Sequence, residues 1–111
     1  MEPQPRTIEF YVTEDGDAPF AVWLDRLRDG QARAQIQRRL ARVRLGLLGD
    51  CKAVGDGVYE MRIDTGPGYR IYFAQVGRAV VLLLCGGDKG SQAADLAKAK
   101  ASWADYQERT P

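Results

Sequence analysis

Two alternating segments on either side of a glycine-proline-glycine turn constrain the fold of this 111-residue chain most strongly. In residues 58–64, Tyr59, Met61 and Ile63 fall on one side, and Ile71 and Phe73 repeat the pattern in residues 69–76. Alternation with a period of two predicts strands that each have one buried face. The short turn at residues 65–68 predicts that the two strands form an antiparallel hairpin.

The register of this hairpin follows from its turn. If the turn is centred near Gly66, Arg62 lies opposite Arg70 and Glu60 lies opposite Tyr72. Directly opposed side chains share a face of the sheet. We therefore expect one apolar face and a second, exposed face that presents two arginines.

The remaining segments complete a single α+β domain over residues 1–111, in the order β, α, α, β, β, β, α. Helix periodicity and turn residues predict a pair of helices that cover one face of the sheet. The first helix is expected to begin at the N-cap Asp17 and to end at Asp29-Gly30. The run from Ala79 to Cys85 lacks alternation, as expected for a central strand buried on both sides. The other expected elements are a first strand (6–13), helices (17–27, 31–48 and 91–108), a glycine-rich loop (46–57) and a flexible loop (86–90).

The composition restricts the class of protein further. A hydrophobic content of 45% can fill one core, and the longest apolar run, residues 79–85, is far shorter than the roughly 20 residues of a membrane span. Residues 1–6 lack the apolar segment of a signal peptide. We therefore expect a cytoplasmic protein with no membrane partner.

The charges are distributed unevenly along the chain. The net charge is only +1, but residues 26–52 carry eight basic and two acidic side chains, whereas residues 1–25 carry one basic and six acidic ones. A basic segment can form an electrostatic footprint for nucleic acid that the total charge conceals. Arg38, Arg39 and Arg42 project away from the apolar stripe of the second helix and are candidate RNA-binding residues; a solvated helix face is the alternative.

The absence of histidine excludes several kinds of enzyme. Histidine is the commonest general acid or base, so a histidine-dependent nuclease or a triad hydrolase is excluded. Cys51 and Cys85 fit neither a disulfide framework nor a zinc spacing, and the glycines at 86–90 do not form a phosphate-binding loop. We expect neither a metal nor a cofactor.

The remaining candidate chemistry is cationic. Arg62 and Arg70 share one sheet face, and Lys89 follows the neighbouring strand. Arginine binds phosphate in a bidentate manner, and two adjacent cations favour an anion between them. The alternative is a structural ion pair in which Glu60 neutralises Arg62.

Three segments resemble the addiction-module killer proteins, a HigB-like branch of the RelE/ParE superfamily of type II toxin–antitoxin systems. They are Gly57-Val-Tyr-Glu-Met-Arg-Ile63, Gly66-Pro-Gly-Tyr-Arg-Ile-Tyr-Phe73 and Leu82-Leu-Leu-Cys-Gly-Gly-Asp-Lys-Gly-Ser-Gln92. With the Phe20–Leu27 helix and Trp103, the similarity covers nearly the whole chain. It implies a RelE-like microRNase fold, in which an N-terminal strand and a helical hairpin pack on a mainly antiparallel twisted sheet that is followed by a C-terminal helix.

The resemblance also implies a function. Many members cut mRNA in the ribosomal A site without a metal or cofactor and are neutralised by a helix-turn-helix antitoxin. By position, Arg70 matches the arginine that contacts the scissile phosphate, and Lys89 matches the basic residue after the last strand. Arg62 is the next phosphate ligand, and Gln92 is expected to hold a base or a phosphate.

The chain departs from the family at the general base. Ribosome-dependent members often use a C-terminal tyrosine or histidine, and residues 90–100 contain neither. Tyr72, on the same face as Arg70, is the candidate that remains. The alternative function is that of a ParE-like poison of DNA gyrase, which shares the fold but needs no cleavage site.

Overall fold

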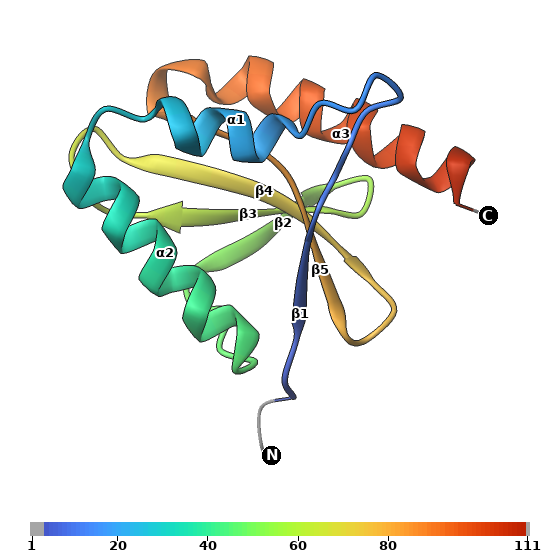
Figure 1. Cartoon of the computed structure of the whole chain (residues 1–111), viewed down its shortest axis with the longest axis horizontal. Helices are drawn as coiled ribbons and strands as arrows, with labels where there is room; N and C mark the ends of the chain where they lie inside the picture. The colour runs from blue at the N-terminus through green and yellow to red at the C-terminus, as the bar shows by residue number, and fades with distance from the viewer. Residues whose placement is uncertain (1–3, 111) are drawn as a thin grey trace.

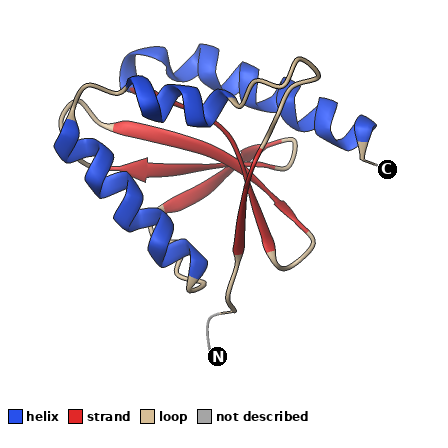
Figure 2. Ribbon diagram, viewed as in Figure 1, coloured by secondary structure: helices blue, strands red, loops and turns tan. Residues whose placement is uncertain are grey.

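One five-stranded mixed sheet organises the molecule, which we describe from a computed structural model over residues 4–110. The strand order is β1-β5-β4-β3-β2. Figure 1 shows α2 along one side of the strands and α3 across the top, and Figure 2 separates helices from strands by colour. The elements are β1 (Thr7–Phe10), α1 (Pro19–Arg26), α2 (Gly30–Arg44), β2 (Cys51–Gly55), β3 (Val58–Ile63), β4 (Tyr69–Val76), β5 (Val80–Asp88), the 3₁₀ turn η1 (Lys89–Ser91) and α3 (Gln92–Arg109).

The predicted α+β class is confirmed. β1 pairs with β5 in parallel, and the other three pairings are antiparallel. The predicted hairpin register is also confirmed, because Arg62 lies opposite Arg70 and Glu60 opposite Tyr72. The arrangement is compatible with a RelE-like fold.

Helices cover both faces of the sheet. Phe20 of α1 and Ile36 and Leu40 of α2 pack with Ile71 and Phe73 on one face. On the other face, α3 packs against a second apolar cluster that contains Tyr72, Leu82, Leu84, Ala99 and Trp103. Because side chains alternate along a strand, Glu60, Arg62 and Arg70 share the α3 face with Tyr72. None of the described helices combines the length and apolar composition that crossing a bilayer requires.

The structure corrects the expected loop at residues 46–57. Cys51–Gly55 forms the edge strand β2, which pairs with β3. The turn that joins them contains Asp56 with a φ of 56° and Gly57 with a φ of 83°. An Asp-Gly pair with both φ values positive closes a tight hairpin, so the sequence did contain a signal for this strand.

The structure also corrects the expected loop at residues 86–90, because β5 continues through both glycines to Asp88. Ile71 pairs with Gly86, and Arg70 pairs with Gly87.

Three expected helix boundaries are wrong as well, and one of them is the end of α2, which lies at Arg44 and not at residue 48. The N-cap of α1 is Ala18 and not Asp17. Asp29 does not end α1 but caps α2, since its carboxylate accepts a hydrogen bond from the Ala32 amide at 3.0 Å.

We expect Gly86→Ala to lower the free energy of unfolding by about 1–3 kcal/mol, because overpacking a tight site forces its neighbours to move. A β-carbon at Gly86 would overlap the ring of Trp23. Gly30→Ala is the matched control, since a β-carbon there meets nothing within 4 Å. Urea unfolding of both variants measures the difference. Equal stabilities would show that the Trp23 ring can move aside.

Candidate functional site

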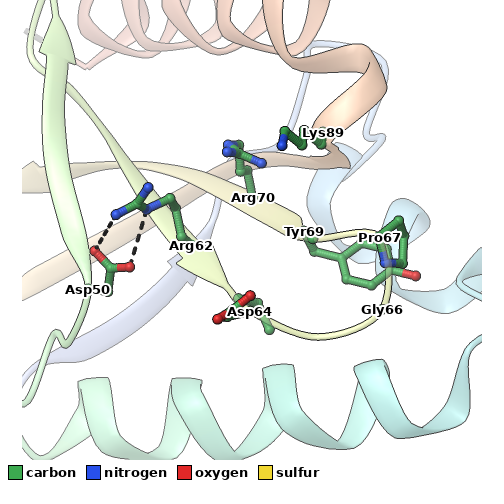
Figure 3. Close-up of a pocket in the computed structure, with 10 residues that line it drawn as sticks. Asp50, Arg62, Asp64, Gly66, Pro67, Tyr69, Arg70 and Lys89 are labelled. Atoms are coloured by element: carbon green, nitrogen blue, oxygen red, sulfur yellow. Dashed lines mark hydrogen bonds and ion pairs between the residues drawn. The ribbon is translucent and has the colours of Figure 1, made fainter.

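A cleft of about 310 Å³ opens where β3, β4 and η1 meet. Arg62, Arg70 and Lys89, which the sequence singled out, all line it, together with the carboxylates Asp50 and Asp64. In the view of Figure 3, Arg70 lies between Arg62 and Lys89. The structure therefore brings the three predicted cations into one cavity.

The glycine-rich turn between β3 and β4 positions Lys89. Gly66 and Gly68 have φ values of 54° and 86°, a conformation that glycine adopts without steric cost. The Gly68 amide donates to the Thr65 carbonyl at 2.9 Å, and the Gly68 carbonyl accepts from the Lys89 amide at 3.1 Å. The turn thus fixes the start of η1 beside the cleft.

Arg62 pairs with Asp50, not with Glu60 as the structural alternative supposed. Its Nε and Nη2 atoms donate to the two Asp50 carboxylate oxygens, each at 3.2 Å. The hydrogen bond to Asp50 is the main reason that the pKa of Arg62 is raised. Both side chains are about half exposed, so this bidentate pair lies at the mouth of the cleft.

Arg70 is held by a buried carboxylate. Its Nε atom lies 3.5 Å from Oε1 of Glu60, close enough for an ion pair but outside hydrogen-bonding geometry. The Glu60 side chain is 1% exposed and that of Arg70 is 13% exposed. The expectation that Arg70 stands on an exposed face is therefore wrong, because Glu60 draws the guanidinium against the sheet.

Tyr72 and Gln92 contact Glu60 and not the cleft. The Tyr72 hydroxyl donates to Oε2 of Glu60 at 3.2 Å, and the Gln92 amide donates to the same oxygen at 3.0 Å. Burial, followed by the negative charge of Glu60, raises the pKa of Tyr72 well above its ordinary value. A fully buried phenol that holds its proton this firmly is unsuited to act as a general base.

The three arginines predicted on the second helix line one cleft, but they differ in how far they are bound to the protein itself. Arg39 turns inward, where its guanidinium donates to the carbonyls of Leu48, Asp50 and Arg62 at 2.7 to 3.3 Å. Burial lowers its pKa. Arg39 therefore ties α2 to the backbone of Asp50 and Arg62, and most of its donors are engaged there.

Arg38 and Arg42 remain exposed. With Arg39 and Asp64 they line a cleft of about 350 Å³, which shares Ile63 and Asp64 with the first cleft. The two clefts therefore meet at the end of β3, and the exposed arginines of α2 lie on one side of that end.

Sequence reasoning missed two acidic residues of this site and assigned a third, Glu60, to Arg62 instead of Arg70. Asp50 and Asp64 line the cleft. Glu60 holds Arg70 in place through their ion pair. The hairpin register placed Glu60 on the arginine face, which was the available signal for its pairing with Arg70. Within residues 4–110, no group of three histidine, cysteine, aspartate or glutamate side chains could hold a metal ion.

We expect Arg39→Ala to lower the free energy of unfolding by about 1–3 kcal/mol, because three carbonyls lose a charged donor. Arg38→Ala, one position away but exposed, should change it by no more than about 0.5 kcal/mol. Urea denaturation followed by circular dichroism measures both. Similar values for the two variants would contradict a structural role for Arg39.

Comparison with known proteins relates the chain to a bacterial relative. No family model matches the chain. An uncharacterized protein of Haemophilus influenzae (strain ATCC 51907 / DSM 11121 / KW20 / Rd) is 46% identical over 81 residues, which is 73% of this chain and 82% of the relative. Identity of this extent over most of both chains shows common descent, and the chain therefore belongs to the same family as this Haemophilus influenzae protein.

Proposed function

We propose that the protein is the toxin of a type II toxin–antitoxin system and that it cleaves mRNA on the ribosome. The observation that carries the proposal is the convergence of Arg62, Arg70 and Lys89 on one cleft. The resemblance of the hairpin and the Gly-Gly-Asp-Lys segment to the addiction-module killer proteins supports the same assignment. The partner would be a helix-turn-helix antitoxin.

The chemistry begins when a ribose 2′-hydroxyl attacks the adjacent phosphate. The 2′-oxygen forms a bond to phosphorus, the bond to the 5′-oxygen of the next nucleotide breaks, and a 2′,3′-cyclic phosphate results. Charge accumulates on the phosphorane, and positioned cations stabilise such charge more in the transition state than in the substrate. Arg70 and Lys89 supply that charge, with Arg62 at the mouth of the cleft.

Two protons must move in this reaction. The cleft offers Asp50 and Asp64 as acceptors for the proton of the 2′-hydroxyl. The Lys89 ammonium can donate a proton to the leaving 5′-oxygen. Tyr72 takes no part as a base, because it is buried and its hydroxyl donates to the Glu60 carboxylate.

We expect Arg70→Lys to reduce mRNA cleavage roughly 100-fold, the usual cost of losing one donor to a transition-state anion. Lysine keeps a cation near Glu60 but lacks the fork that binds phosphate, so the fold should survive. Arg109→Ala is the control, since Arg109 also pairs with a carboxylate, Asp105, but lies outside the cleft. Mapping of mRNA 5′ ends with purified ribosomes measures the effect.

Two results would contradict this assignment. Full cleavage by Arg70→Lys would remove Arg70 from the phosphate site. If the unaltered protein cuts no RNA and instead causes gyrase-linked DNA damage in cells, it is a gyrase poison and not a nuclease.

The proposal also predicts that the ribosome is required. An enzyme with no histidine gains from a partner that holds the mRNA in a reactive geometry, since orientation alone can contribute about 7–11 kcal/mol. Arg38 and Arg42 border the cleft at the end of β3 and would contact ribosomal phosphates. Naked RNA should therefore be cut poorly.

We expect Arg38→Glu and Arg42→Glu each to weaken ribosome binding. Each should also reduce the slope of log K against log salt concentration by about 1, the value of one phosphate contact. Arg78→Glu makes the same charge change in the exposed turn between β4 and β5 and should have little effect. Sedimentation with ribosomes at several salt concentrations measures the three variants. Equal losses in all three would mean that only net charge matters.

A further inference from the structure

A second and larger cleft, of about 620 Å³, lies at the end of β5. β1 pairs with β5 only along Val80–Leu83, so the segment from Cys85 to Asp88 is flanked by helices instead. Trp23 of α1 lines the cleft from one side, and Ser91 and Asp95 line it from the other. The proposed cleavage chemistry uses none of these side chains.

The glycine pair of β5 shapes this cleft. A β-carbon at Gly86 would overlap the Trp23 ring, and one at Gly87 would overlap the Asp95 carboxylate and approach the Ser91 hydroxyl. Two glycines therefore allow an indole and a carboxylate to approach the strand from opposite faces. This requirement explains why a strand that is otherwise rich in valine and leucine contains a Gly-Gly pair near its end.

The side chains of the cleft combine an aromatic surface with a shielded acceptor. Trp23 is partly exposed. Asp95 is only 8% exposed, and Ser91 is the one side chain in the described part of the chain that donates to its carboxylate. Each carboxylate oxygen can accept two hydrogen bonds, so Asp95 keeps acceptor capacity toward the cleft.

The second cleft adjoins the first at the end of one strand. Lys89 lines the first cleft, and its neighbour Asp88 lines the second. Arg70 of the first cleft is the register partner of Gly87 in the second. A nucleotide whose phosphate binds Arg70 and Lys89 can therefore place an adjacent base in the second cleft.

We propose that the second cleft binds a guanine base of the RNA, with the ring on Trp23 and the Watson–Crick edge on Asp95; this inference rests on the proposed RNA-cleaving function. Unpaired RNA bases are commonly recognised by aromatic stacking together with hydrogen bonds to their edges. Guanine presents two adjacent donors on that edge, N1–H and the 2-amino group, which match the two oxygens of a carboxylate. Adenine, cytosine and uracil each present fewer donors there.

The cleft is lined by charges of both signs: the carboxylates are those of Asp17, Asp88 and Asp95. Arg26 and Lys98 also line it, and both are exposed. These two cations can bind a phosphate that flanks the base. Asp88 is already occupied, because its carboxylate accepts from the amides of Gly90 and Ser91.

Tryptophan fluorescence tests the inference without any cleavage reaction. A Trp103→Phe protein keeps Trp23 as its single tryptophan, and its quenching is titrated with the 5′-monophosphates of guanosine, inosine, adenosine, cytidine and uridine. We expect guanosine monophosphate to bind at least about tenfold more tightly than inosine monophosphate, which lacks the 2-amino group, because a hydrogen bond to a charged acceptor is lost. Equal binding of the two would overturn the proposal.

Substitutions then locate the preference. Asp95→Asn should abolish the difference between guanosine and inosine, whereas Asp17→Asn, which removes the same charge from an exposed residue of the same cleft, should retain it. If Asp95→Asn fails to fold, the affinities of the Trp103→Phe protein for guanosine and inosine monophosphate still show whether the cleft prefers guanine. A protein that cuts mRNA but shows no guanosine preference would refute this inference alone. A preference that depends on Asp95 without any cleavage would support the cleft while refuting the nuclease.

Discussion

The buried carboxylate of Glu60 determines how the side chains of the first cleft are arranged. A carboxylate that is 1% exposed loses its hydration, and such a loss costs several kcal/mol unless nearby groups replace the water. Arg70, Tyr72 and Gln92 replace it, and they come from β4 and from the start of α3. One acidic residue of β3 thus fixes the position of the arginine in the cleft and the docking of a helix on the sheet.

Arg39 fills a similar role on the other side of β3. Its guanidinium donates to three carbonyls, those of Leu48 and Asp50 before β2 and that of Arg62 in β3. It therefore holds two separate chain segments together. The segment that carries Asp50 leads into β2, an edge strand that is half exposed, and Arg39 adds polar contacts to the packing of Leu48 and Cys51 on the core. A basic residue of α2 therefore serves the fold, whereas Arg38 and Arg42 are exposed and available for a ligand.

The sequence predicted the features that depend on local patterns. The alternation of residues 58–76 and the turn at Gly66 gave the pairing of Arg62 with Arg70, because register follows from the position of a turn. The end of β5 was not predictable in the same way, since Gly86 and Gly87 are typical of loops and only their contacts with Trp23 and Asp95 show why a strand needs them. Arg38 and Arg39 are adjacent in the sequence and chemically identical. Only the tertiary position of the residue 48–50 segment distinguishes the exposed Arg38 from the partly buried Arg39.

The two arginines of the first cleft differ in how readily they can change partners. Arg70 faces a buried carboxylate that would be left unpaired if the guanidinium moved away, so it is a fixed donor. Arg62 and Asp50 form an exposed pair, and such pairs contribute little to stability. On the proposed function, an incoming phosphate can therefore take Arg62 from Asp50 at small cost. The carboxylate released by this exchange lies in the same cleft as the bound phosphate, where it becomes free to accept the proton of the attacking hydroxyl. Substrate binding would then create the general base that the isolated protein keeps engaged in an ion pair.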